Sequence, residues 1–464
     1  MYRLLISMLS ALALTSWSGH IAASPAENLA QALTYKTVSQ QDRSVIDYAE
    51  FDKLHAFLRA SYPRVFSQLE VEVINKYSLL MHWRGTDPSA VPVLFAAHMD
   101  VVPIEPGTEG EWEYPPFAGT IADGKIYGRG TLDDKQGLIG ILEATEKLLT
   151  EGFAPRRGIS FAFGHDEEIS GPEGAAAIAA RLREQGMHFE WMVDEGGMLL
   201  ADNPILPDLP VAMINVAEKS YLTLTLSTTG PGGHSSRPPK VSTIGRLSAA
   251  LAKIEQNPFP ARLVGPVEAM LEAIGPHSAQ PNRLIFDNLW LTGSLVADQM
   301  ADDPMSNSFV RTTTALTMFN AGVKENVVPQ KAEAKVNFRL LPGDTPEMVL
   351  SYIEDLVDDP AITISFDPWN DRAPVASYPD GGFAVISEAV KTVYPDAVVV
   401  PSLLAGATDT RHYVKEVDNH YRFHGMMINA DQAGSIHGTN EYISVESFDN
   451  MVEVTVQMIR MGSR

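Results

Sequence analysis

The chain has 464 residues, of which 45% are hydrophobic and 20% are charged, as expected for a globular protein with a large core. It carries 35 basic against 58 acidic residues, a formal net charge of −23, which argues against nucleic acid or an anionic membrane as a partner because both require a basic surface. It contains no cysteine, so any bound metal must be held by His, Asp or Glu rather than by a thiolate.

Residues 1–24 predict a secretory signal peptide. The stretch "MYRLLISMLSALALTSWSGHIAAS" has an early Arg3, then an apolar run, then small residues around the expected cleavage site at positions 22–24. The alternative is an N-terminal membrane anchor, for which the apolar run is short. We therefore expect an exported protein, either periplasmic or secreted.

The first half of the chain predicts an α/β domain. A helix, "YAEFDKLHAFLRASYP", places residues 51, 54, 57 and 58 on one face. Four short apolar runs follow, "SLLMHW", "VPVLFAAHMD", "GISFAFGHD" and "WMVDEGG", with helical stretches between the later ones. Three of these four predicted strands end on His or acidic residues, and ligands of open α/β sheets lie at strand ends.

The pattern changes near residue 217, where "SYLTLTLSTTG" alternates apolar and polar residues. The elements that follow predict a β-α-β-β-α-β order, which is that of a ferredoxin-like unit. Later segments return to the first style, so we expect an inserted domain of residues 217–368 within a domain formed by residues 25–216 and 369–464. The stretch 258–310 fits neither pattern.

"HMD" supplies the first candidate metal site. His98 and Asp100 are two residues apart at a strand end, so their side chains leave the chain on one side. A metal-bound imidazole usually donates its other N–H to a carboxylate, and Asp100 is suited to accept it. The alternative is a chance pair.

The other candidate ligands also lie at predicted strand ends or in loops. They are Asp133 and Asp134 in "GRGTLDDKQG", Glu167 and Glu168 in "GHDEE", Asp194 and Glu195 in "VDEGG", and His437 in "SIHGTNE". Adjacent residues leave a strand on opposite sides, so Glu167 and Glu168 suit different roles, one as a ligand and one as a base. The structural alternatives are helix capping by the two aspartates and a hydrogen-bonded role for His437.

Taken together, two histidines and three carboxylate positions suit two zinc ions that share a carboxylate. Two divalent cations also explain how Asp133, Glu168 and Asp194 remain ionised side by side. Neither a G-x-S-x-G nor an H-E-x-x-H motif is present. We interpret His420 and His424, which are four residues apart, as structural.

Several motifs resemble a known family. In chain order they are "AAHMDVVP", "GRGTLDDK", "GHDEEISG", "DEGG", "GGHSSRPP", "NVVPQKAEAKVNFRLLPGD", "GATDTRHY" and "IHGTNE". They resemble those of the di-zinc amidohydrolases that include aminoacylase, carboxypeptidase S, carnosinase and succinyl-diaminopimelate desuccinylase. The branch of carboxypeptidase S and the N-fatty-acyl-amino-acid synthase/hydrolases is the most similar.

The resemblance implies a role for each candidate. Asp133 bridges two Zn²⁺ ions, with Mn²⁺ or Co²⁺ as alternatives, and is followed by a cis peptide to Asp134. His98 and one acid of "DEGG" complete one metal site, and Glu168 and His437 complete the other. Between the two acids we favour Asp194, with Glu195 as the alternative, because adjacent strand residues do not both face one site. Asp100 orients His98, and Glu167 is the general base.

The resemblance also implies residues outside the metal site. His234 stabilises the oxyanion, from the partner subunit if the inserted domain dimerises through an edge at "SYLTLTLSTTG". Arg339 and Arg411 match positions near a substrate carboxylate, and Asn326 matches a substrate contact. The alternatives are a sheet-surface role for Arg339 and a structural turn for Asn326.

The implied activity is hydrolysis of an amide bond in a peptide or N-acyl amino acid, with release of a C-terminal amino acid. The implied fold is an α/β catalytic domain with a central mixed sheet and an inserted ferredoxin-like lid or dimerisation domain. The alternatives are a deacetylase or carbamoyl-amino-acid hydrolase of the same fold, or a catalytically silent binding protein.

Overall fold

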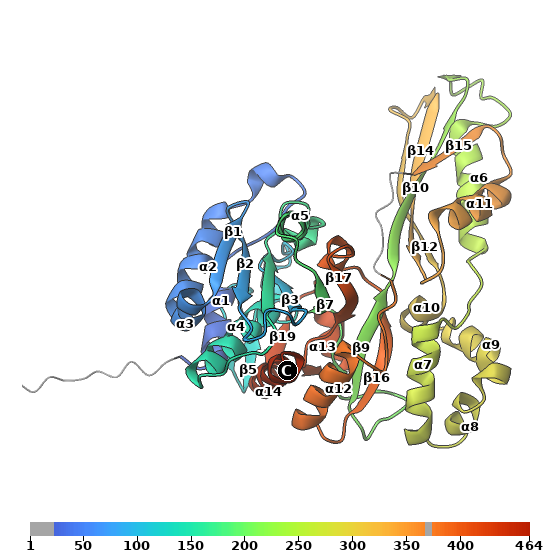
Figure 1. Ribbon diagram of the computed structural model, residues 1–464. Coiled ribbons are helices and arrows are strands. Elements are labelled where there is room, and N and C mark those ends of the chain that lie inside the picture. Colours follow the sequence, from blue (N-terminus) through green and yellow to red (C-terminus); the bar gives the residue numbers. More distant parts are fainter. Residues whose placement is uncertain (1–22, 367–373) are drawn as a thin grey trace, which may run out of the picture.

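The computed structural model describes residues 23–366 and 374–464 (Figure 1). The expected signal peptide lies almost wholly outside this range and stays a prediction, as does the expected domain boundary at residue 369. Within the described part of the chain, none of the helices has both the length and the apolar character needed to cross a membrane.

A ten-stranded mixed sheet forms the core of the larger lobe. Its strand order is β1-β2-β6-β3-β7-β17-β9-β8-β18, and β16 also pairs with β9. The strands are β1 (Glu70–Ile74), β2 (Ser78–Trp83), β3 (Val93–His98), β6 (Ile159–Gly164), β7 (Phe189–Asp194), β8 (Leu199–Leu200), β9 (Val211–Glu218), β16 (Val398–Leu404), β17 (Val417–Arg422) and β18 (Met427–Ile428). This confirms the expected α/β class with a central mixed sheet.

Helices cover both faces of this sheet. They are α1 (Pro25–Leu33), α2 (Tyr48–Ser61), α3 (Pro63–Gln68), α4 (Lys135–Thr150), α5 (Ala175–Glu184), α12 (Gly382–Val393), α13 (Ala430–Ser435) and α14 (Val445–Gly462). The side chains of β3 alternate between the two faces: Phe95 joins the core formed with α4 and α14, and Leu94 joins the core formed with α5. Every residue of β3 is therefore buried, as its continuous apolar sequence indicates.

The second lobe contains the predicted ferredoxin-like unit. Its four-stranded sheet has the order β12-β14-β10-β15. The elements are β10 (Ser220–Thr229), α6 (Thr243–Gln256), β12 (Thr313–Ala321), β14 (Lys331–Leu340), α11 (Pro346–Val357) and β15 (Ile362–Phe366). Leu222, Leu224 and Leu226 of β10 pack with both helices, while the residues between them lie on the opposite face.

One expectation about this sheet is wrong. "SYLTLTLSTTG" corresponds to β10, which pairs with β14 on one side and with β15 on the other, so it offers no free edge. The edge strands are β12 and β15. The alternating pattern identifies a sheet with one covered face, but it does not show whether a strand lies at the edge or in the middle.

The stretch 258–310 is helical. It forms α7 (Gly265–Ile274), α8 (Asn282–Phe286), α9 (Leu289–Met300) and α10 (Pro304–Val310), which lie below the second sheet in Figure 1. Val267, Leu271 and Ile274 of α7 share a core with β16 of the larger sheet. These helices therefore pack against the edge of the central sheet.

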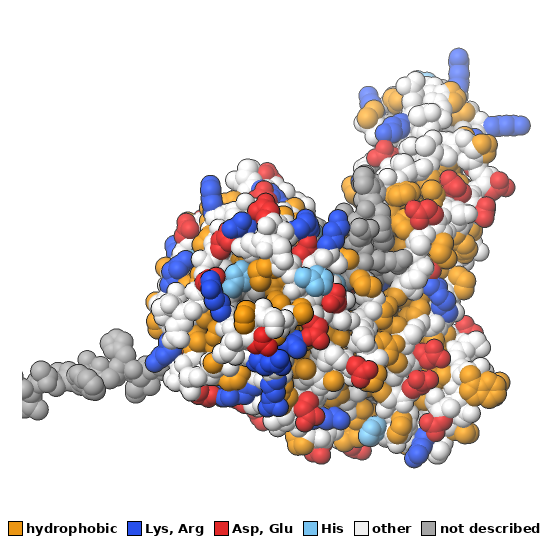
Figure 2. Space-filling model, viewed as in Figure 1, with side chains coloured by type: hydrophobic (Ala, Val, Ile, Leu, Met, Phe, Trp, Pro, Cys, Tyr) orange, Lys and Arg blue, Asp and Glu red, His pale blue; other side chains and the backbone are white. Residues whose placement is uncertain are grey.

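Acidic and basic side chains are interspersed on the face shown in Figure 2, with no broad basic area. This distribution is in line with the net charge of −23.

Candidate metal centre

Three neighbouring parallel strands bring the first candidate ligands to one edge of the central sheet. The strands β6, β3 and β7 run side by side in the same direction. His98 is the last residue of β3, Glu167 and Glu168 follow β6 in a short helical turn, η3 (Glu167–Ile169), and Glu195 follows β7. Their side chains meet because the carboxyl ends of parallel strands lie at the same edge.

The carboxylate of Asp133 lies between two histidines. Its Oδ1 is 3.0 Å from Nε2 of His98, and its Oδ2 is 2.9 Å from Nε2 of His437. A second carboxylate lies beside each imidazole: Glu195 Oε1 is 3.5 Å from His98 Nε2, and Glu168 Oε2 is 3.4 Å from His437 Nε2. Two clusters thus share one carboxylate.

These side chains fit a pair of metal ions. Donor atoms of His98, Asp133 and Glu168 lie within 4.8 Å of one another. Those of His98, Asp134 and Glu195 form a second such group, in which Asp134 stands in place of Asp133. Oε1 of Glu168 is buried without a hydrogen-bond partner among the described residues, as expected for an atom that binds a cation. Nitrogen and oxygen donors in this number suit zinc or a similar divalent ion.

Asp134 has a different role from its neighbour. The Asp133–Asp134 peptide is cis, as expected. Asp134 is buried and makes no side-chain capping bond to α4; its Oδ2 accepts a hydrogen bond from the backbone N–H of His98 at 3.1 Å. Its Oδ1 lies 3.3 Å from Nδ1 of His424, which supports the structural interpretation of that histidine. The oxygens of Asp134 are thus already engaged, whereas those of Asp133 each face a histidine of the cluster.

Asp100 lies behind His98 as predicted. Its Oδ1 is 3.3 Å from Nδ1 of His98, on the opposite side of the ring from the cluster. The same carboxylate accepts hydrogen bonds from the backbone N–H groups of Glu167 at 3.1 Å and Glu168 at 3.2 Å. Burial opposes ionisation of Asp100, but hydrogen bonds from His98 and other donors hold its pKa below the usual value. One carboxylate therefore orients a histidine and the turn that carries both glutamates.

Asp194 and Glu195 each have one feature of a metal ligand. Asp194 is the last residue of β7, and its buried Oδ2 has no hydrogen-bond partner among the described residues. Glu195 is the residue whose carboxylate reaches His98. The preference for Asp194, with Glu195 as the alternative, stays a prediction; it was based on strand alternation, but the strand ends at Asp194 and Gly196 turns the chain with φ of +114°. Sequence alternation is therefore not a guide at this position.

A buried ion pair holds the two loops that carry Asp133 and His437. The small sheet β19-β5-β4 joins the same parts of the chain through β4 (Thr120–Ala122), β5 (Lys125–Tyr127) and β19 (Tyr442–Ser444). Arg129 donates to Oε2 of Glu441 at 2.6 Å and to the backbone oxygen of His437 at 3.1 Å. Glu441 also accepts from the backbone N–H of Leu132 at 2.7 Å. Glu441 is the last residue of "IHGTNE" and was not among the predicted functional residues.

Arg411 lies near the predicted base, and Arg339 lies near Arg411. Arg411 is in the short helix η5 (Asp409–His412), and its guanidinium is 3.7 Å from Oε1 of Glu167. Arg339 is on β14, half-buried, with its guanidinium 4.8 Å from the ring centre of Tyr221. Burial lowers the pKa of Arg339, and the charge of Arg411 lowers it further. The two lobes thus bring two guanidinium groups toward one region.

His234 and Asn326 lie together in the second lobe. His234 is in β11 (Gly233–His234), which pairs with β13 (Val327–Val328), and Asn326 directly precedes β13. The N–H of Ser235 donates to the backbone oxygen of Asn326 at 3.1 Å. Both His234 and Asn326 are exposed. Within the described ranges, no hydrogen bond or ion pair joins either residue to the metal cluster.

The fold and the shared-carboxylate cluster define the chain as a metal-dependent hydrolase. The family model of "Peptidase family M20/M25/M40" matches residues 94–461, so the chain belongs to this family. It is accordingly a metallo-enzyme, of carboxypeptidase or aminoacylase type, that hydrolyses amide bonds of peptides or N-acyl amino acids.

Two relatives and one solved structure illustrate the similarity. The probable carboxypeptidase S-like 2 of Dictyostelium discoideum is 37% identical, with 94% of this chain and 84% of the relative aligned. The N-fatty-acyl-amino acid synthase/hydrolase of Mus musculus is 39% identical, with coverages of 94% and 87%. An M20 family metallo-carboxypeptidase from Sulfolobus solfataricus has the same fold, with a TM-score of 0.68, 18% identity and coverages of 95% and 99%.

Proposed function

We propose that the protein is a two-metal amidohydrolase that removes a C-terminal amino acid from a peptidyl or N-acyl group. The observation that carries this proposal is the carboxylate of Asp133 between His98 and His437, each with its own glutamate. His98, Asp133 and Glu195 would hold one ion, and His437, Asp133 and Glu168 would hold the other. We propose Zn²⁺, which suits these donors.

Bound metal ions supply Lewis-acid activation of water and of the amide carbonyl. The chain supplies the proton transfers through Glu167, which is beside the cluster but is not one of the proposed ligands. In the metal-free site, burial together with the negative charge of Asp409 raises the pKa of Glu167 well above its usual value. Its place beside the cluster suits a group that accepts and then returns a proton. Glu167 takes the proton of the attacking water and delivers it to the leaving nitrogen.

Arg339 and Arg411 provide the basis for substrate orientation. A guanidinium pair suits a free carboxylate, because each fork matches the geometry of its two oxygens. The bond that is cleaved then lies between the acyl group and the amino acid that carries this carboxylate. Relatives named for carboxypeptidase S and for N-fatty-acyl amino acids support peptides and N-acyl amino acids as the substrates to test.

Replacement of Glu167 should separate chemistry from metal binding. We expect Glu167→Ala to abolish turnover while elemental analysis still finds two metal ions per chain, because the base is not a ligand. Loss of both ions from Glu167→Ala would instead reverse the roles of Glu167 and Glu168.

Replacement of Glu195 should identify the ligand that follows β7. Glu195→Gln should lose one of the two ions, whereas Asp194→Asn, the matched control from the adjacent residue, should keep both. Metal loss from Asp194→Asn alone would restore Asp194 as the ligand.

Carboxylate recognition should appear as a preference for free-acid substrates. Losing a charge-assisted contact costs about 1.5–3 kcal/mol, so amidating the substrate's C-terminus should lower kcat/KM by about tenfold to a hundredfold. Arg339→Ala should remove most of this discrimination. Lys335→Ala, a cation replaced on the same face of β14, is the control and should retain it. Equal rates on free-acid and amidated substrates would exclude this mode of recognition.

We also propose that the protein works as a homodimer in which His234 stabilises the oxyanion in the partner subunit's site. The exposed position of His234, with no contact to the cluster of its own chain within the described residues, supports this proposal. The edge strand β12 is a candidate interface, since Leu316, Met318 and Phe319 are exposed along it.

Mixing inactive variants tests the contribution of His234. His234→Ala and Glu167→Ala homodimers should each be inactive, whereas a mixed dimer should regain one working site. That site combines the intact metal cluster of one chain with His234 of the other. Mixed dimers that form, as shown by differently tagged chains, and yet stay inactive would contradict action across the interface.

A further inference from the structure

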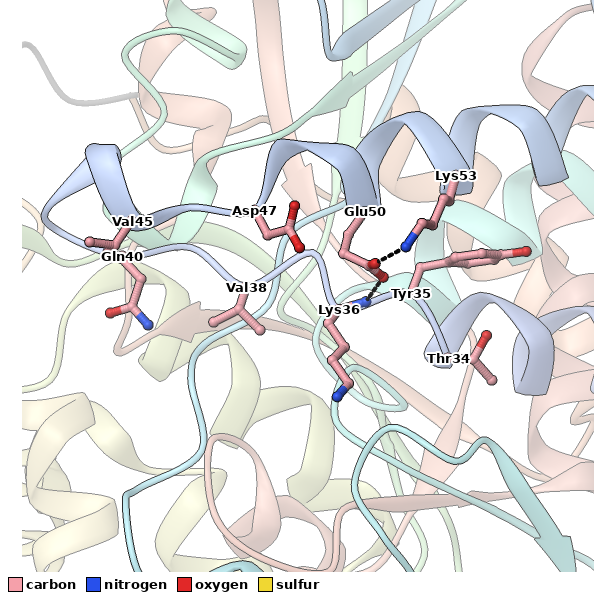
Figure 3. Close-up of a pocket in the computed structure, with 9 residues that line it drawn as sticks. All are labelled: Thr34, Tyr35, Lys36, Val38, Gln40, Val45, Asp47, Glu50 and Lys53. Carbon is pink, nitrogen blue, oxygen red and sulfur yellow. Dashed lines mark hydrogen bonds and ion pairs between the residues drawn. The ribbon is translucent and has the colours of Figure 1, made fainter.

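The segment from Thr34 to Gln40, which we call the N-terminal arm, joins α1 to the short helix η1 (Arg43–Val45). Its side chains alternate between outside and inside. Lys36, Val38 and Gln40 line a surface pocket of about 660 Å³ (Figure 3). The residues between them, Thr37 and Ser39, are buried, with exposed fractions of 0% and 2%. The arm therefore presents one side to solvent and the other to the protein interior.

The buried side of the arm pairs with the segment that follows His98. Val38 forms a parallel bridge with Val101; the N–H of Ser39 donates to the backbone oxygen of Val101 at 3.0 Å, and the N–H of Val101 donates to that of Thr37 at 3.0 Å. The hydroxyl of Thr37 donates to the backbone oxygen of Met99 at 2.6 Å. The arm is thus joined by backbone hydrogen bonds to the segment directly after His98.

The hydroxyl of Ser39 completes the surroundings of Asp100. It donates to Oδ2 of Asp100 at 2.6 Å, and Asp100 is fully buried. The backbone N–H groups of Glu167 and Glu168 donate to Oδ1 and Oδ2 of this carboxylate, respectively. Nδ1 of His98 is 3.0 Å from the backbone oxygen of Asp100 and lies 3.3 Å from Oδ1. Ser39 is the donor to this carboxylate, among the described residues, that comes from outside the ligand-bearing turns.

We propose that Ser39 is a positioning residue for the metal centre, acting through Asp100. The hydrogen bond from Ser39 to Oδ2 fixes the orientation of the Asp100 carboxylate. In this orientation Oδ1 faces His98, and the two oxygens accept hydrogen bonds from the backbone N–H groups of Glu167 and Glu168. The proposal rests on the proposed roles of His98, Glu167 and Glu168. The matched range of the family model begins at residue 94, so the arm lies outside it.

The arm offers a matched pair of variants for the test. Ser39→Ala removes the hydrogen bond to Asp100, and Thr37→Val removes a buried hydrogen bond of the same length from the same arm without touching Asp100. Outer partners of metal ligands are worth about tenfold to a hundredfold in metal affinity or activity. We expect Ser39→Ala to lower kcat about tenfold with KM little changed, and to speed metal release to a chelator about tenfold.

Thr37→Val should retain the wild-type kcat and the wild-type rate of metal release, measured with a chromogenic chelator. Both variants should have similar midpoints of denaturant unfolding, so that a general loosening of the arm is excluded. Ser39→Thr keeps a hydroxyl and should release metal as slowly as the wild type.

Three outcomes would overturn the proposal: equal effects of Ser39→Ala and Thr37→Val, no effect of Ser39→Ala, or metal release from Ser39→Thr as fast as from Ser39→Ala. Failure of the proposed function looks different, because the wild-type holoenzyme would then show no metal-dependent cleavage of any peptide or N-acyl amino acid.

Discussion

The site depends on one carboxylate that is held between two imidazoles. Burial alone would raise the pKa of Asp133, but hydrogen bonds from His437 and His98 reverse this and hold the pKa below its usual value. The carboxylates of Glu168 and Glu195 lie beside the same imidazoles, and burial raises the pKa of both. Such crowding of buried acids is unfavourable unless positive charge is placed among them, and two divalent ions supply it.

The fold assembles this arrangement from distant parts of the chain. His98, Asp133 and His437 come from a strand end, a turn before a helix and a loop near the C-terminus. The parallel strands position His98. The ion pair of Arg129 and Glu441 connects the loops that carry Asp133 and His437. Because both partners of this pair are buried, removing either would leave an uncompensated charge. Polar contacts therefore connect these loops in addition to the apolar packing of Leu132 and Ile443.

Much of the site could be predicted because the ends of the predicted strands can be recognised in the sequence. The apolar runs before His98 and Glu167 end abruptly on polar residues, and parallel strands bring such ends together. The choice between Asp194 and Glu195 could not be made this way, because alternation is informative only within a strand and β7 ends between them. The contacts of Asp134, Glu441 and Ser39 were not predicted, since each joins segments whose proximity only the fold establishes.

In the second lobe, too, contacts between distant segments could not be predicted from the local sequence pattern. The alternating pattern correctly predicted its ferredoxin-like unit, but not which strand is at the edge, since strand order depends on pairing between distant segments. The helices of 258–310 were not predicted because they belong to neither expected pattern. α7 packs against β16 of the central sheet rather than within the ferredoxin-like unit.

The account is tested most directly by counting the metal ions bound to the wild-type chain and to Asp133→Asn. If Asp133 joins two sites, the wild type should bind two divalent ions per chain, and Asp133→Asn should bind neither tightly, since both sites lose a ligand together. An Asp133→Asn variant that still binds two ions, or a wild-type chain that is fully active with one, would contradict the shared carboxylate.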